Sequence, residues 1–342
     1  MLKHYSPLVT GLGDRLIDYV GLATIAQLHD SQLELYITLK DKNRSYNFDL
    51  INIPNTKIII ENSYNVKAKD IIKNGEIFIK YGQNDFPKIL TPNAIIYLKK
   101  NFNLEHISFD KVNETYKSIF QNITTKLNYK EYNDYIGIHL RTGDKINKNL
   151  IIPWSIPWLM TQKQYDKLID VLIYYIINNK YEKFVVFGES NKDIDNFINR
   201  VKQNDITIIN GSKMHTGQNA PIQDLFSLSS TKKIVQGINY STFSMSASLL
   251  GNKELVNFSK ICDLYKSMKW HFDNFNNIIN LNFNPNDIQN TEFFNNFNRQ
   301  NQKDNKIENL KKILLIFLII LIIILVIVFI KKCLIKKYLN KN

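Results

Sequence analysis

Residues 135–145 are YIGIHLRTGDK, an apolar run that changes abruptly into a polar turn. The side chains of Ile136, Ile138 and Leu140 are typical of a buried β-strand, and the turn with Gly143 predicts a loop after it. In open α/β sheets, ligands bind beyond the carboxyl ends of the strands, where this turn is expected to lie. The stretch therefore predicts an α/β fold in which a buried strand ends at a binding site.

The polar residues of this turn suit a phosphorylated ligand. Arg141 carries a planar, permanently charged guanidinium that can hold two phosphate oxygens, and Lys145 adds a mobile charge. His139 and Asp144 can accept, donate or orient protons. An alternative stays open, because Arg141 and Asp144 can also form a surface ion pair with His139 packed beneath it.

The chain after this stretch alternates between apolar helical periods and short apolar runs. Such alternation is typical of a parallel sheet with right-handed crossovers. Helices are expected over 162–178, from 193, over 222–229 and over 242–250, and strands over 183–187, 206–209, 233–237 and 254–258. With the strand at Tyr135, they predict a Rossmann-like domain at 131–274.

Residues 1–130 predict a second α/β domain. Gly11-Leu12-Gly13-Asp14-Arg15 opens an expected helix, and its two glycines let backbone amides approach an anion. Asp14 is equally a good N-cap for an ordinary turn. Strands are expected over 35–39, 57–60, 76–80 and 94–98, and another helix over 112–126.

Two further polar clusters are expected at the sheet edge where His139 lies. Gly188-Glu189-Ser190-Asn191 follows one strand, and Gly237 to Ser244, GINYSTFS, follows another. Backbone amides and hydroxyls of the second cluster can hold a diphosphate without a metal. Alternatively, these hydroxyls cap the next helix.

The composition limits the classes of ligand. Of the net charge of +13, a part of +7 comes from residue 303 onward, and the rest of the chain has no lysine- or arginine-rich run. This argues against nucleic acid as a partner. Cys262 and Cys333 are the only cysteines, and no two histidines have metal-ligand spacing, so we expect no metal. Asp193 and Asp195 resemble the acidic pair of metal-dependent glycosyltransferases, but two acids in a first helical turn mostly stabilise the helix dipole.

The C-terminal part predicts a membrane anchor. Residues 275–312 are Asn-rich and are expected to be a linker. Residues 313–330 are apolar without a charge or a proline, long enough to span about 27 Å of hydrocarbon, and a basic tail follows at 331–342. We therefore expect one transmembrane helix in a lipid bilayer, with the side of the membrane left open.

Taken together, three of these stretches resemble the fucosyltransferase superfamily, most closely the α-1,2-fucosyltransferases. Gly11–Arg15 is similar to that family's N-terminal glycine motif, and His139–Asp144 is similar to its central motif. The segment from Asp224 to Ser229, running on to Ser241–Ser244, is similar to its C-terminal motif. Lys145 instead resembles the α-1,6-fucosyltransferases.

The resemblance implies a GT-B-like architecture, with two Rossmann-like domains and a cleft between them. It implies metal-independent inverting transfer of fucose from GDP-fucose, or from another GDP-sugar, to a glycan or glycoconjugate acceptor, without a further cofactor. Arg141 would hold the β-phosphate and stabilise the leaving diphosphate. His139 and Asp224 would shape the nucleotide pocket. The other residues implied at the sugar-donor site are Gly11, Gly13, Asp14, Arg15, Lys145, Glu189, Ser241, Thr242 and Ser244.

Two departures from the family pattern keep an alternative open. Thr142 occupies a position usually held by a second arginine. The downstream glutamate that is the base of the α-1,6 enzymes has no counterpart, since Asn147 and Asn149 lie there instead. The base is therefore Asp144 or Asp14. The alternative is a catalytically degenerate glycosyltransferase fold that acts as a membrane-anchored binding or scaffold protein.

Overall fold

The structure is a computed structural model. It describes residues 2–6, 11–38, 46–61, 72–73, 76–80, 106–141, 146–147, 160–202, 205–237, 241–257 and 278–280. Contacts divide the chain into Met1–Asn282 and Phe283–Asn342, and all described residues belong to the first unit.

Several predictions from the sequence lie outside these residues and stay predictions. They concern Asp144, Lys145, the strand at 94–98 and the transmembrane helix at 313–330. Within the described part of the chain, no helix combines the length and the apolar character needed to cross a bilayer.

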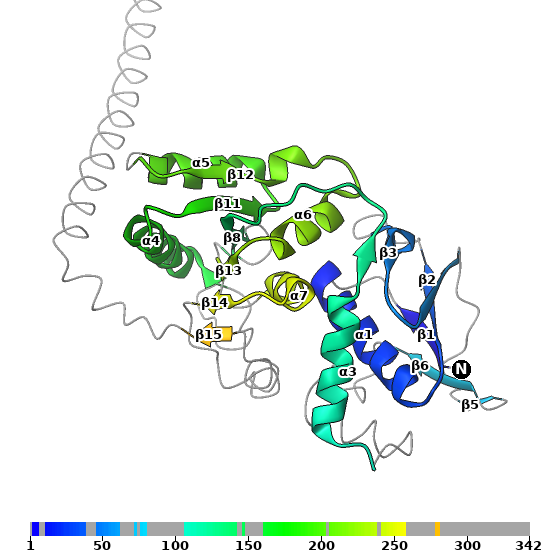
Figure 1. Ribbon diagram of the computed structural model, residues 1–342. Helices are drawn as coiled ribbons and strands as arrows, with labels where there is room; N and C mark the ends of the chain where they lie inside the picture. Colours follow the sequence, from blue (N-terminus) through cyan, green and yellow to red (C-terminus); the bar gives the residue numbers. More distant parts are fainter. Residues whose placement is uncertain are drawn as a thin grey trace, which may run out of the picture. The chain divides into compact units, whose positions relative to one another are not determined.

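The N-terminal sheet confirms the expected α/β character of the first half (Figure 1). Its strands are β1 (Leu2–Ser6), β2 (Leu33–Thr38), β4 (Thr56–Glu61), β5 (Ile72–Lys73) and β6 (Glu76–Lys80). They are ordered β4-β2-β1-β6-β5, and all neighbours are parallel except β5, which is antiparallel to β6. Between β1 and β2 the chain forms the expected helix, α1 (Leu12–Leu28).

The helix expected over 112–126 is shorter and begins earlier than predicted. Helix α3 spans Phe109–Gln121 and ends at its C-cap, Asn122. Thr124–Thr125 instead forms β7, which pairs with β3 (Ile51–Asn52) near the short 3-10 helix η1 (Phe48–Leu50). The two β-branched threonines fit an extended strand better than a final helical turn.

The second sheet has the strand order of a Rossmann fold. Its strands are β8 (Tyr135–Leu140), β11 (Lys183–Gly188), β12 (Ile208–Asn210), β13 (Lys233–Gln236), β14 (Leu255–Asn257) and β15 (Ile278–Asn280). They are ordered β12-β11-β8-β13-β14-β15, and every neighbouring pair is parallel (Figure 1). If these six strands are numbered 1 to 6 along the chain, their order in the sheet is 3-2-1-4-5-6. The direction in which successive strands are added reverses between β8 and β13.

The helices between these strands agree with the predicted alternation. They are α4 (Gln162–Asn178), α5 (Asn191–Val201), α6 (Ala220–Ser229) and α7 (Thr242–Gly251). Helix α4 packs against α5, and α6 packs against α7. Before α4, β9 (Ile146–Asn147) pairs with β10 (Met160–Thr161). Strand β15 lies within the segment expected to be a linker, so the sheet continues past residue 274, while the other domain limits stay predictions.

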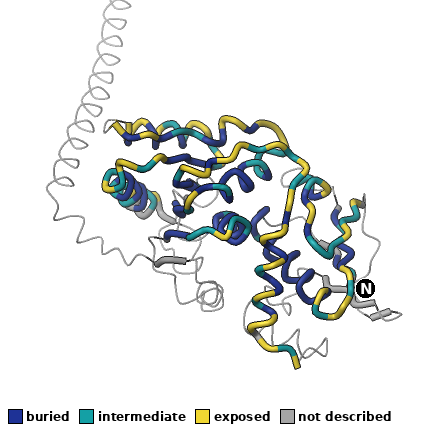
Figure 2. The backbone as a smooth tube through the Cα atoms, in the orientation of Figure 1, coloured by how far each residue is buried: buried dark blue, intermediate teal, exposed yellow. Residues whose placement is uncertain are grey.

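One hydrophobic core joins the two sheets through α1. Helix α1 contacts α3, α7 and β2, and its side chains Leu16, Val20 and Leu22 are fully buried. The same core includes Phe187 of β11 and Ile234 of β13. Figure 2 shows α1 and α7 almost wholly buried, whereas α3 and α5 each have an exposed face. Helix α1 is therefore held against α7, which in turn packs on β13 and β14 of the second sheet.

Candidate functional site

A cavity of about 490 Å³ lies where the order of the second sheet reverses. This volume is typical of a small-molecule site, and the position is the one where open α/β sheets bind ligands. The residues that line it are Gly11, Leu12, Gly13, Tyr46, His139, Arg141, Gly188, Glu189, Asn191, Ser212, His215, Thr216, Gly217, Ala220, Pro221, Asp224, Thr242 and Phe243. The cavity thus joins residues of all three motif stretches singled out in the sequence.

Arg141 lies directly after β8, and the sheet register brings it beside Glu189. Strands β8 and β11 are parallel neighbours with Leu140 opposite Gly188, so the next residue of each strand leaves the sheet at the same edge. Arg141 Nε lies 3.7 Å from Glu189 Oε1. The alternative pairing of Arg141 with Asp144 stays a prediction, because Asp144 lies outside the described residues. Because the Glu189 side chain is half exposed, the pair is expected to be weak.

His139 is buried between hydroxyl groups and an aromatic ring. Its Nδ1 lies 2.8 Å from Ser244 Oγ and 3.2 Å from Ser241 Oγ. Its ring stacks on Phe243, with the centroids 4.7 Å apart. Burial, and then the positive charge of Arg141, lower the pKa of His139 to about 3. His139 is therefore neutral at physiological pH.

The start of α7 confirms the capping role considered for its hydroxyls, and the diphosphate-binding role stays a prediction. Ser241 Oγ accepts a hydrogen bond from the backbone N–H of Ser244, so Ser241 is the N-cap. The Ser241 and Ser244 hydroxyls also contact His139. Of the three hydroxyl residues expected at the sugar-donor site, Thr242 is the one that lines the cavity.

The first turn of α1 touches the first turn of α7. A Cβ atom on Gly13 would lie 2.4 Å from the backbone N of Phe243, which real Cβ atoms do not tolerate. Ser246 Oγ donates a 3.1 Å hydrogen bond to the Gly13 carbonyl oxygen. Glycine at this position therefore lets two helix N-termini meet at the cavity, and both dipoles favour an anion there.

The capping role considered for Asp14 is wrong. Helix α1 begins at Leu12 and its N-cap is Gly11, because the backbone N–H of Arg15 already bonds to the Gly11 carbonyl oxygen at 3.1 Å. Asp14 lies in the first helical turn, where a carboxylate stabilises the helix dipole.

Arg15 is placed behind the cavity wall rather than in it. The residue is 1% exposed. Its guanidinium carbon lies 5.1 Å from the ring centroid of Tyr46 and 5.9 Å from that of Phe48. Of these residues, Tyr46 lines the cavity. Arg15 thus supports an aromatic side chain of the site through cation–π contacts.

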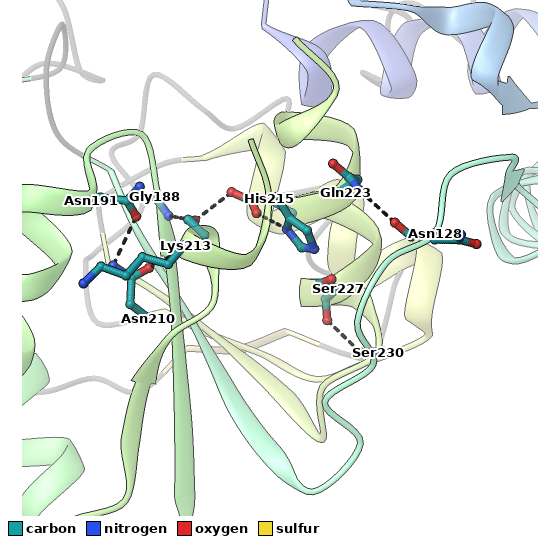
Figure 3. A network of polar contacts seen from close by, with 11 residues as sticks. Asn128, Gly188, Asn191, Asn210, Lys213, His215, Gln223, Ser227 and Ser230 are labelled. Carbon is teal, nitrogen blue, oxygen red and sulfur yellow. Dashed lines mark hydrogen bonds and ion pairs between the residues drawn. The ribbon is translucent and has the colours of Figure 1, made fainter. Parts of the chain in front are cut away.

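A network of polar contacts around Asp224 also lines the cavity, and Figure 3 shows it with His215 and Gly188 labelled. Asp224 Oδ1 accepts a 2.6 Å hydrogen bond from His215 Nδ1, and Oδ2 accepts a 2.7 Å hydrogen bond from Ser212 Oγ. Ser212 Oγ in turn accepts from the backbone N–H of Gly188 at 3.1 Å. Ser212, His215 and Asp224 are all buried. The side-chain network is thus tied to the end of β11.

The sequence interpretation included Asp224 but missed Ser212 and His215. Both belong to the short segment around the 3-10 helix η4 (Ser212–Met214), which follows β12. The only feature of the sequence that could have indicated them is their position directly after a strand, at the same sheet edge as Arg141. Asp193 and Asp195 are not part of the cavity lining, and Asp195 bonds to Lys213 and Asn210 instead. Within the described ranges, no three His, Cys, Asp or Glu residues are grouped to hold a metal.

The cavity has two walls of different chemistry. The Arg141 wall consists of Arg141, His139, Thr242 and Phe243 with the adjoining turn Gly11–Gly13. The Asp224 wall consists of Ser212, His215 and Asp224. The first combines a cation with helix N-termini, whereas the second is built around a carboxylate.

No protein-family model matches the sequence, and no curated protein is similar to it. The structure is similar to solved fucosyltransferase structures at low identity. The NodZ α-1,6-fucosyltransferase soaked with GDP-fucose has 13% identity and a TM-score of 0.45, with 78% of this chain and 96% of NodZ covered. POFUT1 in complex with GDP-fucose has 12% identity and a TM-score of 0.42, and the match covers 73% of this chain and 93% of POFUT1. NodZ from Bradyrhizobium has 14% identity and a TM-score of 0.42, and the match covers 75% of this chain and 96% of NodZ.

These similarities do not specifically support the α-1,2 family, since the matched enzymes include an α-1,6-fucosyltransferase. Because TM-scores below 0.5 do not establish a common fold, the case for a function rests on the cavity's own residues.

Proposed function

We propose that this chain is a GDP-sugar-dependent glycosyltransferase that transfers fucose from GDP-fucose to a glycan. The observation that carries this proposal is that three motif stretches, far apart in the sequence, line one cavity at the reversal of a Rossmann-type sheet. Gly11–Gly13, Arg141 and Thr242 each come from a different stretch and meet there.

The Arg141 wall suits a diphosphate. Arg141 offers charge-assisted hydrogen bonds, and the starts of α1 and α7 add backbone N–H groups and the positive ends of two helix dipoles. The neutral state of His139 keeps a second cation away from Arg141. These groups can neutralise a diphosphate without a metal ion.

The same groups suit the inverting transfer reaction. The acceptor oxygen attacks the anomeric carbon of fucose while the bond from that carbon to the β-phosphate oxygen breaks. The departing GDP takes the bonding electrons, and Arg141 stabilises the negative charge that develops on its phosphate. A base removes the proton of the acceptor hydroxyl, and we assign this role to Asp144 or to Asp14 in the first turn of α1.

We also propose that residues 313–330 anchor the enzyme in a membrane as a single C-terminal helix. The support is the length and apolar character of this segment in the sequence. Flotation of the full chain with liposomes, compared with a chain that stops at residue 302, tests the anchor. Flotation of both chains to the same extent contradicts it.

The enzyme proposal is tested by measuring fucose transfer from GDP-fucose to a mixture of glycans. Arg141→Ala is expected to lower the rate at least about 100-fold, because it removes a cation from the leaving group. Arg200→Ala is the matched control, since Arg200 pairs with Asp170 at 2.7 Å between α5 and α4 and does not line the cavity.

Equal rates for Arg141→Ala and the wild type contradict the assignment. Nucleotide binding without transfer or hydrolysis by the wild type supports the alternative of a degenerate glycosyltransferase fold that serves as a binding or scaffold protein.

A further inference from the structure

Two buried hydroxyl groups, those of Tyr132 and Ser227, have no hydrogen-bond partner in the described part of the chain. Both residues are almost completely buried, and neither lines the cavity. A buried hydroxyl that forms no hydrogen bond is unfavourable, and most such groups in folded proteins bond to the protein or to an internal water. The two hydroxyls therefore indicate a further partner inside the fold.

Helix α6 places Ser227 in one row of side chains with Asp224. Asp224, Ser227 and Ser230 are spaced three residues apart, so they follow one another along one side of the helix and its C-cap. The backbone N–H of Tyr132 donates a 2.8 Å hydrogen bond to Ser230 Oγ. Figure 3 shows Ser230 bonded in turn to Ser227, through a 2.7 Å hydrogen bond from its Oγ to the Ser227 carbonyl oxygen. Tyr132 is thus fixed at one end of a row that leads to Asp224.

The side chain of Tyr132 extends from this end toward Asp224. Its ring makes edge-to-face contacts with Phe187 of β11 and Tyr135 of β8, at centroid distances of 5.8 Å and 5.5 Å. Burial, and then the negative charge of Asp224, raise the pKa of the Tyr132 phenol, so its hydroxyl lies near that carboxylate. No direct hydrogen bond joins the two groups. Since Ser227 is one turn from Asp224 in the same row, the two hydroxyls and the carboxylate surround one place in the core.

These three groups have the hydrogen-bonding capacity that an internal water needs. The Asp224 oxygens accept from His215 and Ser212, and each oxygen keeps a second lone pair. A water molecule can accept a hydrogen bond from the Tyr132 hydroxyl and donate to Asp224 and Ser227. These are the three bonds typical of a buried water. An anion, by contrast, is repelled by the carboxylate.

We propose that one internal water molecule binds beside α6 and joins the hydroxyls of Tyr132 and Ser227 to the Asp224 carboxylate. Polar groups that are too far apart for a direct hydrogen bond are commonly bridged in this way. The water extends the buried network of Ser212, Asp224 and His215 into the core and gives Asp224 a third hydrogen bond. The inference goes beyond the proposed function and does not depend on it, because it concerns the folded chain without a nucleotide.

The direction of one stability change tests the water site. Tyr132→Phe removes the hydroxyl and keeps the ring that packs on Phe187. If a water holds the hydroxyl, its loss is expected to raise the unfolding equilibrium constant of the full chain about fivefold in urea denaturation. If the hydroxyl has no partner, its removal relieves an unpaired buried group, so an unchanged or lower constant overturns the proposal.

A double-mutant cycle tests whether the two hydroxyls share one water. The effect of Ser227→Ala on the unfolding equilibrium constant is measured in the wild type and in Tyr132→Phe. The helix propensity of alanine cancels in this comparison, because the same substitution is made in both backgrounds. We expect the two effects to differ by at least about threefold, and equal effects overturn the shared site.

Tyr135→Phe is the matched control, because its half-buried ring is a neighbour of Tyr132. Its unfolding equilibrium constant is expected to stay within about twofold of the wild type. A crystal structure of the full chain at high resolution gives the direct observation, even if Tyr132→Phe does not fold. One water within hydrogen-bond distance of Tyr132 Oη, Ser227 Oγ and Asp224 is expected, and a protein side chain in that place overturns the proposal.

Discussion

The two walls of the cavity are built from different kinds of groups. The Arg141 wall combines one guanidinium with the N-termini of α1 and α7, so much of its polarity comes from the backbone. The Asp224 wall is a chain of side-chain hydrogen bonds from Ser212 through Asp224 to His215. One wall therefore attracts anions through the arrangement of its helices, and the other accepts hydrogen bonds through specific side chains.

The two histidines show how far surroundings control one residue type. His139 contacts two hydroxyl groups and lies near a cation, so its pKa falls to about 3. His215 donates to a carboxylate at 2.6 Å. The first histidine serves as a neutral spacer beside Arg141, whereas the second is held by Asp224 at the border of the cavity.

The largest expected effect comes from separating the helix starts of the Arg141 wall. In Gly13→Val the new Cβ lies 2.4 Å from the Phe243 backbone N, so the two helices must move apart. We expect a loss of more than about 3 kcal/mol in the free energy of unfolding, measured by urea denaturation, together with loss of GDP binding.

Gly11→Ser is the control for this variant. A Cβ on Gly11 meets only Asp14 Oδ2, at 3.8 Å, and serine is a good N-cap. Its unfolding free energy is expected to stay within about 0.5 kcal/mol of the wild type. Wild-type stability of Gly13→Val disproves the close contact.

The next largest effect comes from removing the carboxylate of the Asp224 wall. Asp224→Leu leaves the His215 N–H and the Ser212 hydroxyl buried without their acceptor. We expect a loss of about 2–4 kcal/mol in the free energy of unfolding by urea denaturation. Asp195→Leu, which breaks an exposed pair with Lys213, is expected to change it much less. Equal losses for the two variants refute a special role for the buried network.

The pH dependence of stability tests the contrast between the walls. In the unfolded chain His139 becomes protonated below its ordinary pKa of 6.5. In the folded chain, burial and the charge of Arg141 lower this pKa to about 3, so His139 becomes protonated only near pH 3. Stability is therefore expected to fall as the pH drops through this window, by up to about 1.4 kcal/mol per pH unit. His139→Gln is expected to flatten this slope in urea denaturation between pH 7 and 4, and an unchanged slope contradicts the burial of His139.

The smallest effect concerns a bond between the N-terminal part and α6. Asn47 Nδ2 donates a 2.8 Å hydrogen bond to Asn219 Oδ1, although both residues are N-caps whose side chains make no cap bond. Asn47→Ala is expected to lower the free energy of unfolding by about 1 kcal/mol in thermal denaturation.

Asn133→Ala serves as its control, because the Asn133 bond to Glu131 is exposed. It is expected to leave the melting temperature unchanged. No difference between these two alanine variants indicates that the Asn47 bond contributes nothing.

Much of the second sheet was predictable from local patterns. Helix α4 has the predicted limits, and β8, β11 and β13 follow the expected apolar runs. Strand β12 begins two residues later than expected, after a turn in which Asp205 has a φ of 52°, a conformation that periodicity does not reveal. The order of strands and helices was enough to predict at which edge of the sheet the motifs lie.

The parts that could not be predicted depend on contacts between distant segments. Gly13 is required because α7 packs on α1, and nothing near Gly13 in the sequence signals Phe243. Arg15 looked like an anion-binding residue, yet it is buried beside Tyr46 because α1 is enclosed on several sides. His215 had no motif, and its partner Asp224 was visible only through a family resemblance.

The role of the Arg141 wall in holding a diphosphate is measured by calorimetric titration of the full chain with GDP and with guanosine. GDP is expected to bind at least about 100-fold more tightly than guanosine, because the Arg141 wall holds the diphosphate, and Arg141→Ala is expected to remove most of this difference. Equal binding of GDP and guanosine by the wild type, or an unchanged GDP affinity in Arg141→Ala, contradicts it.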